Sequence, residues 1–475
     1  MGRSKKPNLI FLMADQLRAD VLGAYGDSQC PTPKLDLLAS HSTVFDRHYT
    51  PCPLCLPARA SIMTGLYPHQ HGATINGWLP TERIHGTINQ GVSLLPKHLI
   101  DAGYHVAHVG VQHVRCQPDF WSQLKGVEFH GRPGEGEHRK ELEKRNLFLG
   151  DRSVFKTPVI EHDCGRPVVY PANSPHTAVF PLREELFYDS VLADKMIKTI
   201  ESCDGDKPFA MFGNFWLPHP PLWAPEEFAN LISPKNVHLP VTVGKWYSGM
   251  PVMQLMNVPG HLGAHVTEEQ WQKAWAMYLG MVAFLDKCIG RVLAALDYAQ
   301  MFEDSVIVVT SDHGEMLGCH SMYQKMCLYE DVARVPMMVK LPGQSHSHRS
   351  TALTSHIDVA ATMLDFAGGE PMPESEGQSM RQLADASAPS SETRKYIFSA
   401  YSGNAGRGYH HRMVCSKTYK FIHNVGDRAE LYDLIDDPRE TTNLAGREEH
   451  AHTEGELRAE LSMWMRDMGD DQPPC

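Results

Sequence analysis

The segment from His48 to Gly72 reads H-Y-T-P-C-P-L-C-L-P-A-R-A-S-I-M-T-G-L-Y-P-H-Q-H-G. Its centre is C-L-P-A-R, from Cys55 to Arg59, and a short helical pattern follows at once and closes at Gly65. A reactive side chain at Cys55 would therefore lie where a loop enters a helix. Backbone N–H groups and the positive end of the helix dipole favour an anion at such a position. The segment thus predicts a site for a sulfate or phosphate group.

Two apolar runs of strand length are each followed by polar residues that suit such a site. N-L-I-F-L-M-A leads into Asp15 and Gln16, and S-V-I-V-V-T-S leads into Asp312 and His313. Continuous apolar runs are typical of strands buried on both faces of a mostly parallel sheet. Two such strands end at the same edge of the sheet, where open α/β sheets bind ligands. The sequence therefore predicts that these four polar residues converge.

The remaining pattern predicts a catalytic α/β domain over residues 1–380 and a small C-terminal α+β subdomain over 381–475. Helices are expected at residues 33–40, 93–102, 183–201, 267–300 and 356–367, and further strands at 43–45, 104–109, 208–216 and 335–340. Residues 117–181 are rich in Gly, Pro and charge, so we expect a long loop that shapes the substrate site. The C-terminal part is expected to form an antiparallel sheet with a closing helix at 448–467.

The composition excludes several classes of partner. The 475 residues are 42% hydrophobic and 21% charged, which is typical of a soluble globular chain. The formal net charge of −12 argues against nucleic acid and anionic membranes as partners. No apolar stretch approaches the ~18 residues of a membrane span, and the apolar run after the basic N-terminus is too short for a signal peptide. Because the eleven cysteines are scattered and odd in number, a cytoplasmic location is expected.

C-x-P-x-R followed by A-S-x-x-T-G resembles the signature of the type I sulfatases, a family of the alkaline phosphatase superfamily. The resemblance implies an alkaline-phosphatase-like α/β fold and hydrolysis of sulfuric esters. It also implies that a maturation enzyme, either formylglycine-generating or anaerobic, converts Cys55 to formylglycine. Cys52 does not head the same pattern, because Leu54 stands where the motif has proline. A buried structural cysteine is the alternative explanation of Cys55, since free cysteines are usually buried.

The same resemblance extends to a metal site. Asp15, Gln16, Asp312 and His313 match the sulfatase metal ligands one by one, and the formylglycine oxygen derived from Cys55 completes the coordination. Oxygen ligands dominate this set and suit a hard divalent cation. One cation is expected, with Ca²⁺ as the first expectation and Mn²⁺ or Mg²⁺ as alternatives. The Asp-Gln and Asp-His pairs resemble the choline sulfatase and phosphonate monoester hydrolase branches.

The other catalytic residues also follow from the resemblance. Arg59 resembles the arginine that holds the nucleophile, whereas His219 in P-H-P-P and Lys325 in H-S-M-Y-Q-K resemble the pair that faces the leaving-group oxygen. His113, in G-V-Q-H, falls where the family has the histidine of G-K-x-H. In the implied mechanism the aldehyde hydrate attacks sulfur and His219 or Lys325 protonates the departing alcohol. His113 then deprotonates the second hydroxyl, and sulfate leaves.

One departure from the family pattern is Val111, which stands where the family usually has a lysine that neutralises the bound sulfate. Arg115, two residues past His113, is our hypothesis for the missing charge, because an arginine can bind two oxygens at once. His69 and His71 of Y-P-H-Q-H-G are further candidates.

The expected function is the release of sulfate from a small, anionic organic or sugar sulfate ester. The first alternative is hydrolysis of phosphonate monoesters or phosphodiesters by the same apparatus. The second is a non-catalytic anion-binding protein in which Cys55 stays a thiol. The alcohol part of the substrate and a homo-oligomeric state are open at this point.

Overall fold

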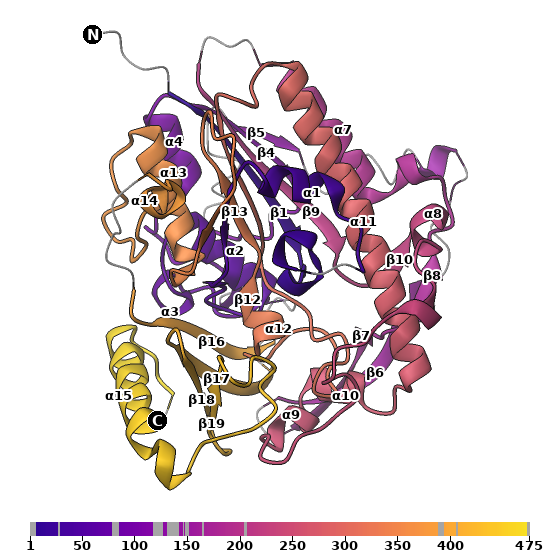
Figure 1. Cartoon of the computed structure of the whole chain (residues 1–475), viewed down its shortest axis with the longest axis vertical. Coiled ribbons are helices and arrows are strands. Elements are labelled where there is room, and N and C mark those ends of the chain that lie inside the picture. The colour runs from indigo at the N-terminus through magenta and orange to yellow at the C-terminus, as the bar shows by residue number, and fades with distance from the viewer. Residues whose placement is uncertain are drawn as a thin grey trace.

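A sheet of eight strands lies at the centre of the computed structural model (Figure 1). The strand order is β14-β2-β13-β11-β1-β9-β4-β5. In this order the strands comprise His348–Ser350, Thr43–Phe45, Met337–Lys340, Ser305–Ser311, Asn8–Asp15, Phe209–Pro218, His105–Gly110 and Val127–His130. β13 pairs antiparallel with both neighbours, and every other neighbouring pair is parallel. The structure describes residues 6–26, 29–77, 85–116, 127–130, 142–145, 147, 152–163, 166–203, 207–387, 394–404 and 407–472.

Helices cover both faces of this sheet because its central strands are apolar on both sides. In β1, Ile10 and Leu12 lie in one hydrophobic cluster, whereas Phe11 and Met13 lie in another. The first cluster includes α1, α7 and α11 (Pro33–Ala39, Tyr188–Glu201 and Glu268–Tyr298), and the second includes α2, α4 and α13 (Cys55–Thr64, Leu95–Asp101 and Ile357–Ala367). Figure 1 shows α4 and α13 on one side of the sheet and α7 and α11 on the other. The predicted mostly parallel α/β sheet is confirmed.

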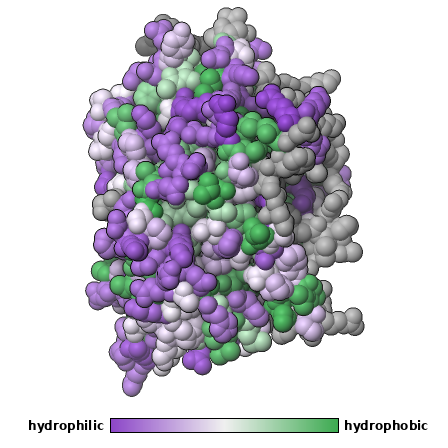
Figure 2. All heavy atoms as spheres, turned by 90° about the vertical axis from the view of Figure 1, so that its right-hand side faces the viewer, coloured by the Kyte–Doolittle hydropathy of each residue, from purple (hydrophilic) through white to green (hydrophobic). Residues whose placement is uncertain are grey.

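Shorter elements connect these layers. The helices α3, α8, α9, α10, α12 and α14 comprise Pro68–His71, Glu226–Ala229, Met253–Met256, Val258–Gly263, Glu330–Ala333 and Arg381–Ala384. A three-stranded sheet has the order β12-β3-β15, from Arg334–Val335, His48–Tyr49 and Thr354–Ser355. On the face shown in Figure 2, hydrophobic areas are small and are separated by hydrophilic side chains wherever the atoms are coloured. Among the described helices, none has the length and apolarity that a membrane crossing requires.

The C-terminal part forms the expected antiparallel sheet. β16, β17, β18 and β19 comprise Ile397–Asn404, Arg407–Cys415, Tyr419–Asn424 and Glu430–Asp433, and α15 (Ala451–Asp467) packs against them. Trp464 of α15 stacks on Phe398, with ring centroids 5.1 Å apart, and meets Tyr67 edge to face at 5.2 Å. Tyr67 follows α2, so these rings join the C-terminal sheet to the segment that carries Cys55. The domain boundary at residue 380 stays a prediction.

The prediction of a long loop over residues 117–181 is wrong where the structure describes this segment. β6 (Lys156–Asp163) and β7 (Arg166–Asn173) form an antiparallel hairpin, and β8 (Thr177–Val179) pairs with β10 (Leu222–Ala224). Prolines hide the hairpin in the sequence, since Pro158 and Pro171 interrupt its apolar positions and lie opposite each other. Residues 117–126 and 131–141 of the predicted loop lie outside the described residues.

Candidate active site

The ends of β1 and β11 bring two aspartates to one edge of the sheet. The strands pair in parallel up to Ala14 opposite Ser311, and Asp15 and Asp312 follow directly. The backbone N–H of Gln16 donates to Asp312 Oδ1 at 3.0 Å. Gln16 has a φ of 70°, in the left-handed region that a residue with a long side chain rarely adopts. Such strain is frequent at functional sites, where the surrounding structure stabilises it.

Cys55 is the first residue of α2 and lies fully inside the protein. Its Sγ atom lies 2.9 Å from Lys325 Nζ, 3.3 Å from His313 Nε2 and 3.7 Å from Asp15 Oδ1. Burial, together with the charge of Asp15, raises the pKa of the Cys55 thiol to about 12. The thiol is therefore protonated at neutral pH.

Arg59 follows one helical turn after Cys55 and holds both aspartates. Its Nη2 donates to Asp15 Oδ2 at 2.8 Å, and its Nε donates to Asp312 Oδ2 at 2.9 Å. A third bond, from Nη1 to the carbonyl oxygen of Val111, measures 2.5 Å. Burial would raise the pKa of Asp312, but the positive charges of Arg59 and Lys325 hold this pKa well below its usual range. Arg59 occupies the Oδ2 atom of each aspartate, and Asp15 Oδ1 lies near Cys55.

These side chains form a donor set that fits a divalent cation. One ligand atom each from Asp15, Cys55, Asp312 and His313 lies within 4.8 Å of the others, and all four residues are buried. The His313 Nδ1 atom donates to the carbonyl oxygen of Gly314 at 3.0 Å, which leaves Nε2 with its lone pair. Burial lowers the pKa of His313 to about 3, so the imidazole is neutral. Two carboxylates and a neutral imidazole suit a divalent cation.

The two histidines that were predicted to transfer protons, His219 and His113, both lie near the indole ring of Trp216. The rings of His219 and His113 have centroids 4.3 Å and 6.4 Å from Trp216, near the end of β9. His219 Nδ1 donates to the carbonyl oxygen of Pro220 at 2.6 Å. Burial, and next the charge of Lys325, lowers the pKa of His219 well below 6.5. The structure therefore holds His219 as a neutral imidazole whose Nε2 is an acceptor.

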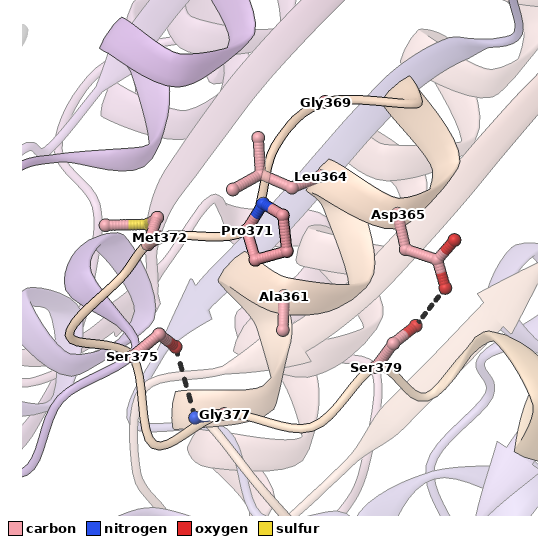
Figure 3. Close-up of a pocket in the computed structure, with 9 residues that line it drawn as sticks. All are labelled: Ala361, Leu364, Asp365, Gly369, Pro371, Met372, Ser375, Gly377 and Ser379. Carbon is pink, nitrogen blue, oxygen red and sulfur yellow. Dashed lines mark hydrogen bonds between the residues drawn. The ribbon is translucent and has the colours of Figure 1, made fainter.

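A separate pocket on α13 does not share residues with this site (Figure 3). Its polar side chains bond to residues close to them in the sequence. Ser379 donates to Asp365, and Asp365 also forms an ion pair with Arg381 at 3.0 Å. Ser375 accepts from the backbone N–H of Gly377. With its carboxylate already paired, this pocket presents no convergent charged groups for an anionic substrate.

Comparison with known proteins agrees with the geometry around Cys55. The family model described as Sulfatase matches residues 7–369, which is more than half of the chain. The chain belongs to the sulfatase family. A second model, described as N-sulphoglucosamine sulphohydrolase, C-terminal, matches residues 318–467. The protein is therefore a sulfatase-family enzyme, and the expected membership of the alkaline phosphatase superfamily is confirmed.

Individual relatives of this sulfatase are distant but cover nearly its whole length. An N-acetylglucosamine-6-O-sulfatase of Bacteroides thetaiotaomicron is 27% identical over 99% of this chain and 88% of its own. A choline-sulfatase of Rhizobium meliloti is 27% identical over 93% of this chain and 82% of its own. The solved phosphonate monoester hydrolase of Agrobacterium radiobacter has a TM-score of 0.81 at 22% identity, covering 98% of this chain and 96% of its own. The last similarity concerns the fold alone.

In this sulfatase, Val111 is buried and the three candidates for the missing lysine differ in their surroundings. Arg115 donates from Nη1 to the carbonyl oxygens of Asn76 and Gly77, at 3.0 and 2.6 Å. Burial, and next the charge of His69, lowers the pKa of His71 to about 3, so His71 carries no charge at neutral pH. His69 lies against the C-terminal part, with its Nε2 atom 3.6 Å from a carboxylate oxygen of Asp470.

Sequence reasoning missed two residues that support the site. Asn76 accepts from the backbone N–H of Leu56 at 3.1 Å, in the first turn of α2. Glu315 accepts from the side-chain amide of Gln16 and is buried. Glu315 could have been found in S-D-H-G-E, because it follows His313 by two residues. Asn76 stands in a segment with no local pattern, so only the folded chain places it beside Cys55.

Proposed function

We propose that this sulfatase hydrolyses small organic or sugar sulfate esters with a formylglycine derived from Cys55 and one divalent cation. The contacts of Cys55 Sγ carry the proposal, because this atom touches Lys325, His313 and Asp15 at the start of α2. In the matured enzyme a formylglycine oxygen would take the place of this sulfur atom. The proposed partner in maturation is a formylglycine-generating or anaerobic enzyme that reads C-L-P-A-R.

Asp15, Gln16, Asp312 and His313 would hold the cation in this proposal. A bound divalent cation supplies positive charge that polarises the sulfate group and favours the ionised nucleophile. Ca²⁺ is the first expectation because oxygen ligands dominate, with Mn²⁺ and Mg²⁺ as alternatives. Arg59 supports the arrangement, since its bonds to the two Oδ2 atoms fix the orientation of both carboxylates.

Lys325 is the proposed acid for the departing alcohol. Burial lowers its pKa, but its hydrogen bond to Cys55 and the negative charges of Asp15 and Asp312 outweigh burial and raise this pKa above 10.5. The ammonium group therefore keeps its proton at neutral pH. His219, which is neutral in the free enzyme, would accept a hydrogen bond near the leaving group. His113, whose ring also lies near Trp216, would take the proton from the second hydroxyl as sulfate leaves.

A substrate panel tests the proposal. The protein is produced with a maturation enzyme and assayed for free sulfate from sugar 6-O-sulfates, choline sulfate and a nitrophenyl sulfate. An aryl phosphonate monoester and a phosphodiester are assayed in parallel. We expect the highest kcat/KM with a sulfate ester, no turnover in Cys55→Ala and normal turnover in Cys52→Ala. A higher kcat/KM for the phosphonate or the phosphodiester would overturn the proposal in favour of that activity.

A further inference from the structure

Glu315 is a buried carboxylate whose three hydrogen-bond donors come from both sides of the site. It lies two residues after His313 and is 1% exposed. Its Oε2 atom accepts from the side-chain amide of Gln16. Its Oε1 atom accepts from the backbone N–H of Leu317, at 2.9 Å, and from the backbone N–H of Gln324. One side chain thus bonds the residue that follows β1 and the loop that carries Lys325.

The bond to Gln16 fixes which end of the Gln16 amide faces the site. A carboxylate can only accept, so the NH₂ group of Gln16 must point to Glu315. The amide oxygen then faces the opposite way, and it accepts from Lys325 Nζ at 3.0 Å. Without this bond the amide could turn over and present its NH₂ group to the ammonium, which would separate the two groups.

The two bonds of Oε1 close the loop on which Lys325 lies. Leu317 and Gln324 stand near opposite ends of this loop, and the backbone N–H of Met316 also donates to the carbonyl oxygen of Gln324 at 2.8 Å. The loop is strained, because five of its residues other than glycine have positive φ: Leu317, His320, Ser321, Gln324 and Met326. A strained loop keeps its shape only where neighbouring contacts hold it. Lys325 follows directly after the residue that Glu315 holds.

We propose that Glu315 is a positioning residue. It orients the Gln16 amide oxygen toward the Lys325 ammonium group and so holds both groups beside Cys55. Glu315 does not touch Cys55 in this account, and it acts through the two residues that it orients. Its effect on turnover rests on the proposed function, in which Lys325 protonates the alcohol. Its effect on Gln16 is independent of turnover and should alter the affinity for a divalent cation.

The test compares Glu315→Gln with Trp275→Phe. Glu315→Gln keeps the size of the side chain but adds an NH₂ group among three donors. Trp275→Phe is the matched control, because Trp275 is also buried and its hydrogen bond, to the carbonyl oxygen of Leu317 at 2.7 Å, holds the same loop without involving the Gln16 amide. Circular dichroism checks that both variants fold. If Glu315→Gln does not fold, Glu315→Asp, which keeps the carboxylate on a shorter chain, replaces it.

The first measurement is kcat/KM over a series of aryl sulfates whose alcohols differ in acidity. In Glu315→Gln we expect a loss of at least tenfold for the least acidic alcohol and less than threefold for the most acidic one, because only a poor leaving group needs the acid. In Trp275→Phe any loss should be equal over the series. An equal loss over the series in Glu315→Gln, or no loss, would overturn the proposal.

The second measurement is the affinity for Mn²⁺ and Ca²⁺ by calorimetry on the unconverted thiol protein, which needs no turnover. We expect at least a tenfold weaker affinity in Glu315→Gln and an unchanged one in Trp275→Phe. Unchanged affinity in Glu315→Gln would overturn the proposal. If the parent protein hydrolyses none of the aryl sulfates, the proposed function fails on its own, and calorimetry alone decides the role of Glu315.

Discussion

Lys325 donates from Nζ to Cys55 Sγ over 2.9 Å, although the two residues come from segments 270 positions apart. The same ammonium group donates to Gln16 Oε1 at 3.0 Å. Lys325 is 4% exposed, so its charge acts in a site from which most water is excluded. An acid at this distance from the proposed nucleophile can reach the alcohol oxygen that departs from the sulfur atom of the bound sulfate ester.

Lys325→Met should therefore slow the hydrolysis of poor leaving groups most. We expect kcat/KM to fall by about a hundredfold or more for an alkyl sulfate, since general acids typically contribute 10²- to 10⁴-fold. The loss should be smaller for a nitrophenyl sulfate, whose phenolate leaves without a proton. Steady-state kinetics with both substrates measure the difference. An equal loss for the two substrates would show that Lys325 acts only in binding.

His219→Gln provides a test of the charge on His219. Because burial and Lys325 lower the pKa of His219 below 6.5, this imidazole is neutral in the free enzyme at every pH above that value. The kcat/KM profile reports the free enzyme. We expect its shape between pH 6.5 and 9 to be the same in His219→Gln as in the parent, at a lower level. If the parent profile rises or falls in that pH range and the His219→Gln profile does not, His219 titrates there.

Asp312→Asn should weaken the binding of the cation with little change in shape. The substitution keeps the size of the side chain but removes the charge of one hard oxygen ligand. We expect the dissociation constants for Ca²⁺ and Mn²⁺, measured by calorimetry, to rise by about a hundredfold, and turnover to be lost. Asp286→Asn is the control, because Asp286 is a buried carboxylate that accepts from the backbone N–H of Leu35 in α1 at 2.7 Å. Equal affinities in the two variants would contradict the metal assignment.

Arg115→Ala tests the proposal that Arg115 compensates for Val111. Arg115 holds the carbonyl oxygens of Asn76 and Gly77, and Asn76 accepts from the first turn of α2. The variant should lose both a positive charge and the support of this segment. We expect kcat/KM to fall at least tenfold, which corresponds to about 1.4 kcal/mol of transition-state stabilisation. Normal turnover in Arg115→Ala, together with little change in Val111→Lys, would show that the site needs no cation there.

Arg412→Ala should destabilise the protein without acting on the site. Arg412 is buried and donates to Asp470, at 2.9 Å from Nη2, and to the carbonyl oxygen of Tyr401 at 2.7 Å. Removing one partner of a buried ion pair typically costs about 3–5 kcal/mol. Urea unfolding should show a loss of that order. In Arg458→Ala, which breaks a partly exposed pair with Glu454, the loss should stay below about 1 kcal/mol. Similar losses in both variants would contradict this account.

The central strands could be predicted because burial on both faces leaves a direct trace in the sequence. The runs that form β1 and β11 are apolar at every position, so the residues after them could be placed at one edge before the structure was known. The helix that ends at Gly65 was also predicted, but α2 begins at Cys55, so C-L-P-A-R forms its first turns and is not the loop before it. The structure brings Asp15, Cys55, Asp312 and His313 together, and their chemical roles stay predictions.

The contacts of the supporting residues could not be predicted, because they depend on the path of the backbone. Glu315 accepts hydrogen bonds from the backbone N–H groups of Leu317 and Gln324 because the intervening loop adopts left-handed backbone conformations. No local sequence pattern predicts these conformations. The β6–β7 hairpin was missed since prolines lie at its paired positions and break the alternation that predicts a strand. Arg115 was recognised as a candidate cation, but its bonds to Asn76 and Gly77 follow from a fold that joins distant segments.

The central claim is that sulfate release depends on conversion of Cys55 to formylglycine. The direct measurement is free sulfate released per protein molecule in preparations with different extents of maturation, with the extent read by peptide mass spectrometry at Cys55. We expect the rate to rise in proportion to the converted fraction and to extrapolate to zero for the pure thiol. A preparation that holds Cys55 entirely as thiol and still turns over at the full rate would contradict the claim.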